Sequence, residues 1–154
     1  MCRVCWAFVT VLVLLSGGLI YKFVLSGEVK FSADGREAIV LTEPERALVL
    51  AEMRTFLDSV QQITKGVANG NMKTVTDAAN LVGRGAQQGM PGSLVGKLPL
   101  NFKKLGFDTH SKFSQLALDA EQLGDEQHAL SQLSELMENC VACHEMFKIE
   151  VEMK

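Results

Sequence analysis

Cys140-Val141-Ala142-Cys143-His144 is the stretch that decides the fold and chemistry of this 154-residue chain. Two cysteines separated by two residues and followed at once by a histidine form the attachment signature of a c-type haem. On a helix these positions share one face. Both thiols could then form thioethers to one porphyrin, while the imidazole binds the iron from the same side. The motif predicts one covalent haem c on Cys140 and Cys143, with His144 as the proximal iron ligand.

Two other kinds of site use paired cysteines, namely zinc sites and redox dithiols. A zinc site needs two further ligands, but neither His110 and His128 nor Cys2 and Cys5 have the spacing that would complete one. A redox dithiol needs a βαβ context, and the flanking sequence is helical instead. Cys2 and Cys5 repeat the cysteine spacing without the histidine, so we predict that they belong to a membrane segment and bind no cofactor.

Length and composition suit one domain with an appendage. The formal net charge is −3, which gives no case for nucleic-acid binding. Aromatic residues make up 6% of the chain and there are seven methionines, which favours a helical core over an all-β one. The sequence offers no acid–base pair or substrate pocket of the kind an enzyme needs, so we predict that the protein is not an enzyme.

The N-terminus carries an apolar segment without a charged residue from Trp6 to Tyr21. A membrane span needs about 20 largely apolar residues, and residues 4–25 reach that length if Lys22 extends to the interface. Residues 1–25 are therefore predicted to form a transmembrane anchor. The alternative is a cleaved signal sequence, because Ser16-Gly17-Gly18 offers small residues for cleavage.

The charge flanking this segment predicts its orientation. Arg3 and the amino terminus give a positive bias to the inner side of the membrane. The rest of the chain would then lie outside the cytoplasm, where c-type haem is usually attached. We expect a single-pass protein of the bacterial inner membrane with its haem domain on the periplasmic side.

Residues 26–41 link the anchor to the domain. Asp34-Gly35 lies between two β-prone runs, which is typical of a hairpin turn. A plain extended linker is the alternative. The domain itself is expected to span residues 42–154.

The remaining sequence predicts four helices in an all-α domain. Thr42 and Glu45 form a capping box at the start of the first helix, which Gly66 is expected to stop. Short links between the first two and the last two helices predict an antiparallel up-down four-helix bundle. The expected helices cover residues 42–65, 72–82, 108–123 and 125–148, with a short helix at 98–105 inside a long connection.

The chain resembles the cytochrome c-prime family, the class II c-type cytochromes, over residues 42–150. The resemblance rests on the four helices with Cys140-Val141-Ala142-Cys143-His144 on the last one, Phe147-Lys148 after it, Gly124-Asp125 before it, Lys65-Gly66, and Arg46 four residues before Leu50. It implies a covalent haem with His144 as proximal ligand, used for electron transfer or for binding small gases. It also implies that Leu50 occupies the distal position.

Three residues are candidates for the distal side of the haem. Leu50 cannot bind iron, so it would leave a five-coordinate haem for NO or CO. Met53 lies nearer the middle of the apolar stripe of its helix, and His/Met coordination suits electron transfer, although Met at such spacing is often simple packing. His110 is a third distal candidate at the same end of the bundle. His128 belongs to the opposite end.

We therefore expect a membrane-anchored monohaem cytochrome that exchanges electrons with a membrane or periplasmic redox partner. The alternatives are a five-coordinate haem protein for NO or CO and a haem relay subunit of a larger membrane complex. A homodimer is one possible assembly of the protein. A group of lysines expected near the haem could steer a redox partner: Lys97, Lys103, Lys104, Lys112 and Lys148.

Overall fold

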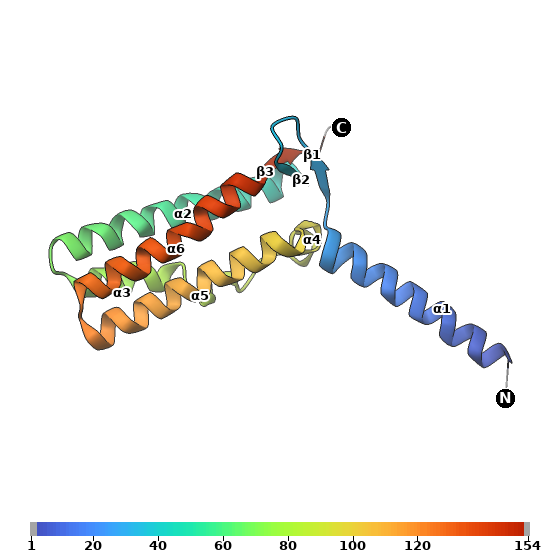
Figure 1. The fold of residues 1–154 in the computed structure, drawn as a ribbon, viewed down its shortest axis with the longest axis horizontal. Coiled ribbons are helices and arrows are strands. Elements are labelled where there is room, and N and C mark those ends of the chain that lie inside the picture. The colour runs from blue at the N-terminus through green and yellow to red at the C-terminus, as the bar shows by residue number, and fades with distance from the viewer. Residues whose placement is uncertain (1–2, 153–154) are drawn as a thin grey trace.

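The computed structural model describes residues 3–152, which are mostly helical and begin with one apolar helix (Figure 1). Its elements, in chain order, are α1 (Arg3–Ile20), η1 (Tyr21–Ser26), β1 (Val29–Phe31), β2 (Glu37–Leu41), α2 (Glu43–Ala68), α3 (Met72–Leu81), η2 (Arg84–Gln87), α4 (Gly92–Lys97), α5 (Leu100–Leu123), α6 (Glu126–Met146) and β3 (Phe147–Val151).

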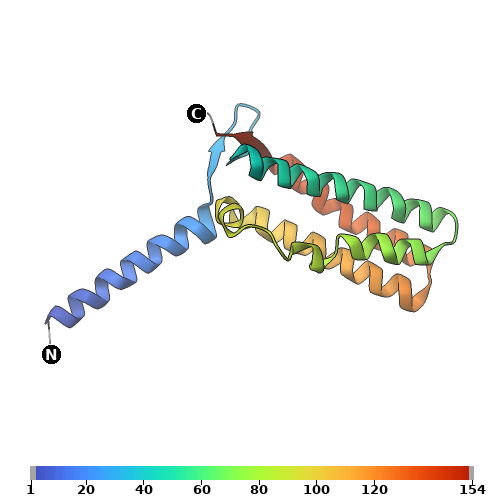
Figure 2. The same ribbon diagram turned by 180° about the vertical axis from the view of Figure 1, so that it is seen from behind.

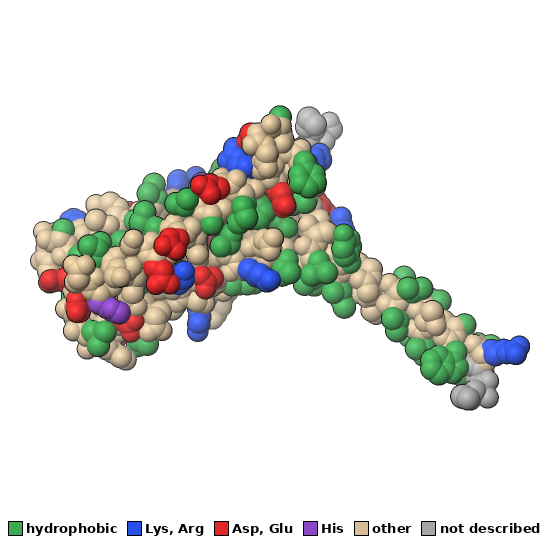
Figure 3. Space-filling model, viewed as in Figure 1, with side chains coloured by type: hydrophobic (Ala, Val, Ile, Leu, Met, Phe, Trp, Pro, Cys, Tyr) green, Lys and Arg blue, Asp and Glu red, His purple; other side chains and the backbone are tan. Residues whose placement is uncertain are grey.

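The helix α1 continues through the wider π-helical turn η1 and projects from the rest of the molecule (Figures 1 and 2). Residues Arg3–Ser26 form an apolar helical stretch of 24 residues that contains an 18-residue window with a mean hydropathy of 2.2, and none of it is buried. By length and composition it could cross a membrane. Figure 3 shows its hydrophobic side chains exposed along the helix.

Helices α2, α3, α5 and α6 lie alongside one another. Both α2 and α5 contact α3 and α6. Their shared core is made of fully buried apolar side chains, which stabilise the fold in proportion to the area removed from water. The largest of them are Ile63, Val75, Phe113, Leu116 and Leu136.

Local capping places the start of three of these helices where the sequence predicts. Thr42 accepts a hydrogen bond from the Glu45 amide, and the Glu45 carboxylate accepts one from the Thr42 amide at 3.0 Å, which confirms the capping box. Asn71 caps α3 and Asp125 caps α6 in the same way. Each cap satisfies a backbone donor that the helix itself leaves free.

A three-stranded sheet corrects the all-α prediction. β1 and β2 form an antiparallel hairpin, so the hairpin predicted between the anchor and the domain is confirmed over an extended linker. β3 pairs with β2 in parallel. The last helix was expected to reach Lys148 but ends at Met146. Phe147-Lys148-Ile149-Glu150-Val151 alternates apolar and polar residues, the period of a strand, and β2 offers it a partner.

Two helices also continue through glycines that were expected to interrupt or stop them. α5 runs unbroken from Leu100 to Leu123 with Gly106 inside it, so the separate short helix and the start near residue 108 were wrong. α2 passes Gly66 and ends at Ala68. A Cβ at Gly66 would lie 2.7 Å from a methyl group of Val75. This glycine therefore permits close packing of α3 and does not stop the helix.

Lys97 joins three elements at the end of the molecule that carries the sheet. Its Nζ lies 2.9 Å from Glu45 Oε2 and 2.8 Å from Glu152 Oε1. The hydrogen bond from Lys97 is the main reason that the pKa of Glu45 lies below its ordinary value of 4.5, and the same pairs raise the pKa of Lys97. The group thus connects the start of α2, the end of α4 and the chain just after β3.

Lys97→Met is expected to lower the free energy of unfolding by about 2 kcal/mol at pH 7, as for other hydrogen bonds to charged groups. Because the folded-state pKa of Glu45 is depressed, its stabilisation is complete above the unfolded value of 4.5 and is lost as the pH falls through the folded value. Urea unfolding of both proteins at pH 7 and at pH 3 would measure this. An equal difference at the two pH values would contradict the assigned role of the pair.

Candidate functional site

A cavity of about 490 Å³ lies among α2, α5 and α6, at the end of these helices that carries the sheet. α6 contributes the three motif residues Cys140, Cys143 and His144 to its wall. The opposite walls are mostly apolar and come from the other two helices: Leu50, Met53, Phe56, Leu57 and Val60 of α2, and Phe102 and Leu105 of α5. The spacing of the motif on a helix therefore does bring both thiols and the imidazole to one cavity.

The rotation of α6 about its axis is held by the residue just before the motif. Asn139 is buried, and its Nδ2 donates hydrogen bonds to Asp108 Oδ2 at 2.8 Å and to Thr109 Oγ1 at 3.2 Å, both on α5. Cys140 then packs against the main helical core, while Cys143 packs against the cluster beside the sheet.

Burial also sets the acidity of the two thiols. It raises the pKa of Cys140 and raises that of Cys143 to about 11. Both cysteines are free thiols in this structure. A redox dithiol needs a low thiol pKa, so the pair does not match that class of site.

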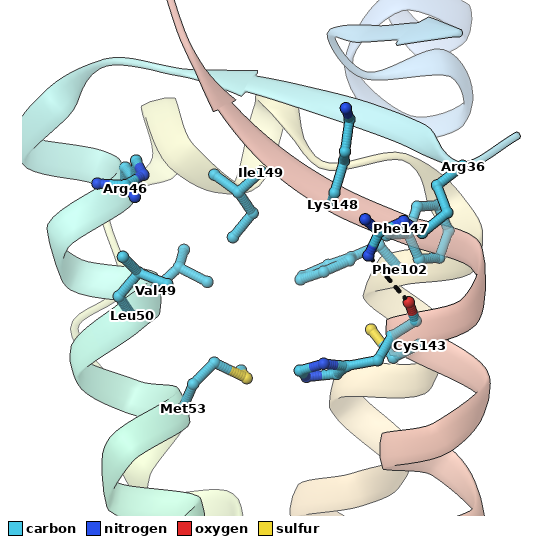
Figure 4. Close-up of a pocket in the computed structure, with 11 residues that line it drawn as sticks. Arg36, Arg46, Val49, Leu50, Met53, Phe102, Cys143, Phe147, Lys148 and Ile149 are labelled. Atoms are coloured by element: carbon cyan, nitrogen blue, oxygen red, sulfur yellow. Dashed lines mark hydrogen bonds between the residues drawn. The ribbon is translucent and has the colours of Figure 1, made fainter. Parts of the chain in front are cut away.

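A second cavity of about 200 Å³ adjoins the first and shares with it Leu50, Met53, Phe102, Cys143 and His144. Figure 4 shows Met53 of α2 and Cys143 of α6 pointing into the same space from opposite sides. The structure thus brings both distal candidates, Leu50 and Met53, to the space that the motif faces.

Three cationic side chains line this smaller cavity. Arg36 Nη2 lies 2.7 Å from Asp34 Oδ2, and its Nη1 donates to the backbone carbonyl of His144 at 3.4 Å (Figure 4). The other two are Arg46 and Lys148, which pair with Glu43 at 3.6 Å and Glu150 at 2.8 Å. The larger cavity is therefore mostly apolar, and the smaller one is lined by three cations that each pair with a carboxylate.

His110 is placed inside α5, away from the first turn in which it was expected. It is buried in the wall of the large cavity with both ring nitrogens engaged: Nδ1 lies 2.7 Å from the Val82 carbonyl oxygen and Nε2 3.3 Å from Glu52 Oε1. Burial alone would lower its pKa, but the hydrogen bonds to Glu52 and Val82 outweigh this and raise it. His110 therefore joins α3, α5 and α2 next to Met53, and neither nitrogen is available for a metal.

The remaining predicted residues lie elsewhere. His128 is at the other end of α6, with Nε2 3.5 Å from Asp119. Cys5 is an exposed residue of α1, and Cys2 lies outside the described residues. The lysines do not form one free patch, because four of them contact groups of the protein itself: Lys97, Lys103, Lys112 and Lys148.

Sequence reasoning missed the roles of Arg36, Phe102 and the His110–Glu52 pair. Each depends on contacts between residues far apart in the chain, for which the sequence carries no local signal.

No family model matches the chain, and no curated protein or solved structure matches it. Within residues 3–152, no three His, Cys, Asp or Glu side chains are grouped so that they could hold a metal ion.

Proposed function

We propose that this protein is a membrane-anchored monohaem c-type cytochrome that exchanges electrons with a redox partner. In this proposal α2, α3, α5 and α6 form a four-helix bundle of the cytochrome c-prime type, on the periplasmic side of a bacterial inner membrane. The observation that carries it is the common cavity of Cys140, Cys143 and His144 on one side and Leu50 and Met53 on the other.

The chemistry of the cavity fits a haem. Its volume of about 490 Å³ falls in the usual range for bound cofactors, about 300–1,000 Å³. Its walls are mostly apolar, as suits a porphyrin, and two thiols are available for thioethers. His144 supplies one imidazole, and the porphyrin would bring the other iron donors with it. A site for a bare metal ion would need several protein ligands together.

Each part of the site then has a role in binding the proposed haem. Cys140 and Cys143 would hold the macrocycle covalently, and His144 would bind the iron. Arg36, Arg46 and Lys148 line the adjoining cavity and would be available to pair with carboxylates of the bound group, besides the protein's own acids. Bound haem supplies a one-electron iron couple, while the apolar walls exclude water from it and so help to set its potential.

The distal residue separates the proposal from its strongest alternative. Ligation by Met53 gives a six-coordinate haem suited to electron transfer. Leu50 lines the same cavities and favours the alternative, a five-coordinate haem that binds NO or CO. An absorption spectrum of the reduced protein with and without CO distinguishes them: a low-spin spectrum unchanged by CO supports electron transfer, and a high-spin spectrum that shifts with CO supports gas binding.

Gly106→Leu is expected to sharply reduce the fraction of chains that carry haem. Gly106 lines the large cavity, and a Cβ built there meets no atom within 4 Å, so a leucine side chain would enter the open space. The same change should favour α5 itself by about 1 kcal/mol, because glycine is a poor helix former. Intact mass spectrometry gives the haem-loaded fraction, and circular dichroism reports the helix content. Gly106→Ala is the control, since it has the same helix benefit and little added volume. Full haem loading of the leucine variant would contradict placement of the cofactor in this cavity.

The anchor has its own test. If residues 1–25 are retained and span the membrane, the purified protein should need detergent to stay in solution, and its intact mass should include Met1 or the residue after it. A soluble protein whose mass begins after Gly18 would instead indicate a cleaved signal sequence.

A further inference from the structure

We propose that the first turns of α5 rest on the lipid headgroups of the membrane, with Phe107 and Lys104 in contact with them. This inference rests on the proposed membrane anchoring. It adds that the apolar helix is fixed to the domain and does not act as a flexible tether. The partner of this surface is therefore the bilayer itself.

The junction between the apolar helix and the domain is closely built. Lys103 of α5 donates a hydrogen bond to the carbonyl of Phe23 at 2.7 Å and approaches that of Val24 at 3.4 Å. A positive charge at these carbonyls also complements the negative end of the helix dipole. The ring of Phe23 lies against Gly96 of α4, where a Cβ would come within 3.2 Å of it.

The chain after η1 is held just as closely. Gly27 has a φ of +65°, and a Cβ there would lie 2.4 Å from the carbonyl oxygen of Lys97, so another residue would be strained and would clash with backbone. The Glu28 amide donates to that same carbonyl at 2.7 Å, and the Glu28 carbonyl accepts from the Val40 amide at 2.8 Å. The helix thus passes into the sheet without a flexible segment.

This junction directs one face of α5 toward the membrane. Phe107 lies one turn after Lys103, on the same face of the helix. It is 53% exposed, although it is a large apolar side chain, and Lys104 beside it is exposed as well. An exposed Phe can enter the boundary between headgroups and acyl chains, and a Lys beside it attracts anionic lipid headgroups.

The placement has a consequence for the cavity. The same two turns of α5 that would touch the lipid present Phe102, Leu105 and Gly106 to the cavity on their other side. Only one helix, about 10–12 Å across with its side chains, would then separate the cavity from the headgroups.

The test uses the full-length, haem-loaded protein in nanodiscs of phosphatidylcholine and phosphatidylglycerol. The photo-crosslinking residue p-benzoylphenylalanine replaces Phe107 in one sample. In the control it replaces Leu123, which is similarly exposed at the far end of the same helix. After illumination, mass spectrometry measures lipid adducts. We expect strong adducts at position 107 and background levels at position 123. Equal adducts at both positions, or none at position 107, would overturn the proposal.

A second variant tests the rigid junction. It combines Lys103→Met with a Gly/Ser segment inserted between Ser26 and Gly27, and neither change touches the cavity. We expect adducts at position 107 to be lost while the need for detergent and the absorption spectrum stay unchanged; undiminished adducts would overturn the inference. If intact mass shows that the protein carries no covalent haem when it is produced in cells that attach haem c, the proposed cofactor fails, whereas adducts at position 107 of that protein would still support the inference. A protein that needs no detergent would refute both the anchor and this inference.

Discussion

Cys140→Ser combined with Cys143→Ser is expected to give a full-length protein with no covalent haem. Both sulfur atoms line the large cavity from one face of α6, so both are placed to bond the same macrocycle. Serine keeps the size and helix position but cannot form a thioether. Intact mass spectrometry would show the loss of the haem mass, and haem staining after denaturing electrophoresis would lose its signal.

Two matched variants separate attachment from other effects. Cys5→Ser removes an exposed cysteine of α1 and should leave haem attachment unchanged. His144→Ala should keep the covalent haem, because both thiols remain, but should change the absorption spectrum through loss of the proximal ligand. Haem that stays bound to the doubly substituted protein after denaturation would contradict the assignment of these cysteines.

Met53→Ala is expected to convert a low-spin cytochrome that does not bind CO readily into one that does. Met53 of α2 lines both cavities that His144 of α6 also lines, it points into the smaller one (Figure 4), and its thioether suits haem iron. Its removal leaves the distal side open. The reduced spectrum with and without CO measures the change.

Loss of packing must be separated from loss of a ligand, because Met53 is partly buried and truncating a fully buried Met to Ala costs about 2–5 kcal/mol. Met53→Leu keeps most of the volume and removes only the sulfur, so it should also bind CO. Met137→Leu changes another methionine of the large cavity and should behave like the unmodified protein. A spectrum in both Met53 variants that matches that of the unmodified protein would contradict ligation by Met53.

The parts of the fold that depend on neighbouring residues could be predicted from the sequence. Thr42, Asn71 and Asp125 cap helices because a short polar side chain reaches amides only three residues away. The motif works in the same local way, since its spacing alone places Cys140 and Cys143 on one face. Both the helix starts and the composition of this face of α6 therefore follow from short stretches of sequence.

The parts that depend on distant contacts could not be predicted as well. β3 has the alternation of a strand, but whether it leaves the helix depends on pairing with β2, more than a hundred residues earlier. α5 continues through Gly106 because tertiary packing of the rest of the helix, with Phe113 and Leu116 fully buried, outweighs a local cost of about 1 kcal/mol. His110 was expected in the first turn of this helix because the helix was expected to begin near residue 108. It lies in the interior because the helix begins at Leu100.

The parallel pairing of β2 with β3 also determines when during synthesis the fold can be completed. It joins residues 37–41 to residues 147–151, so it cannot form until nearly the whole chain has been synthesised. β2 leads into α2 and β3 follows α6, and these helices carry opposite walls of the cavity. Until the last strand docks, α2 and α6 are joined by the helical core alone, without the sheet that links their ends beside the cavity. If haem is attached as proposed, we expect attachment to precede this docking, which completes the wall of the smaller cavity with Phe147, Lys148 and Ile149 of β3.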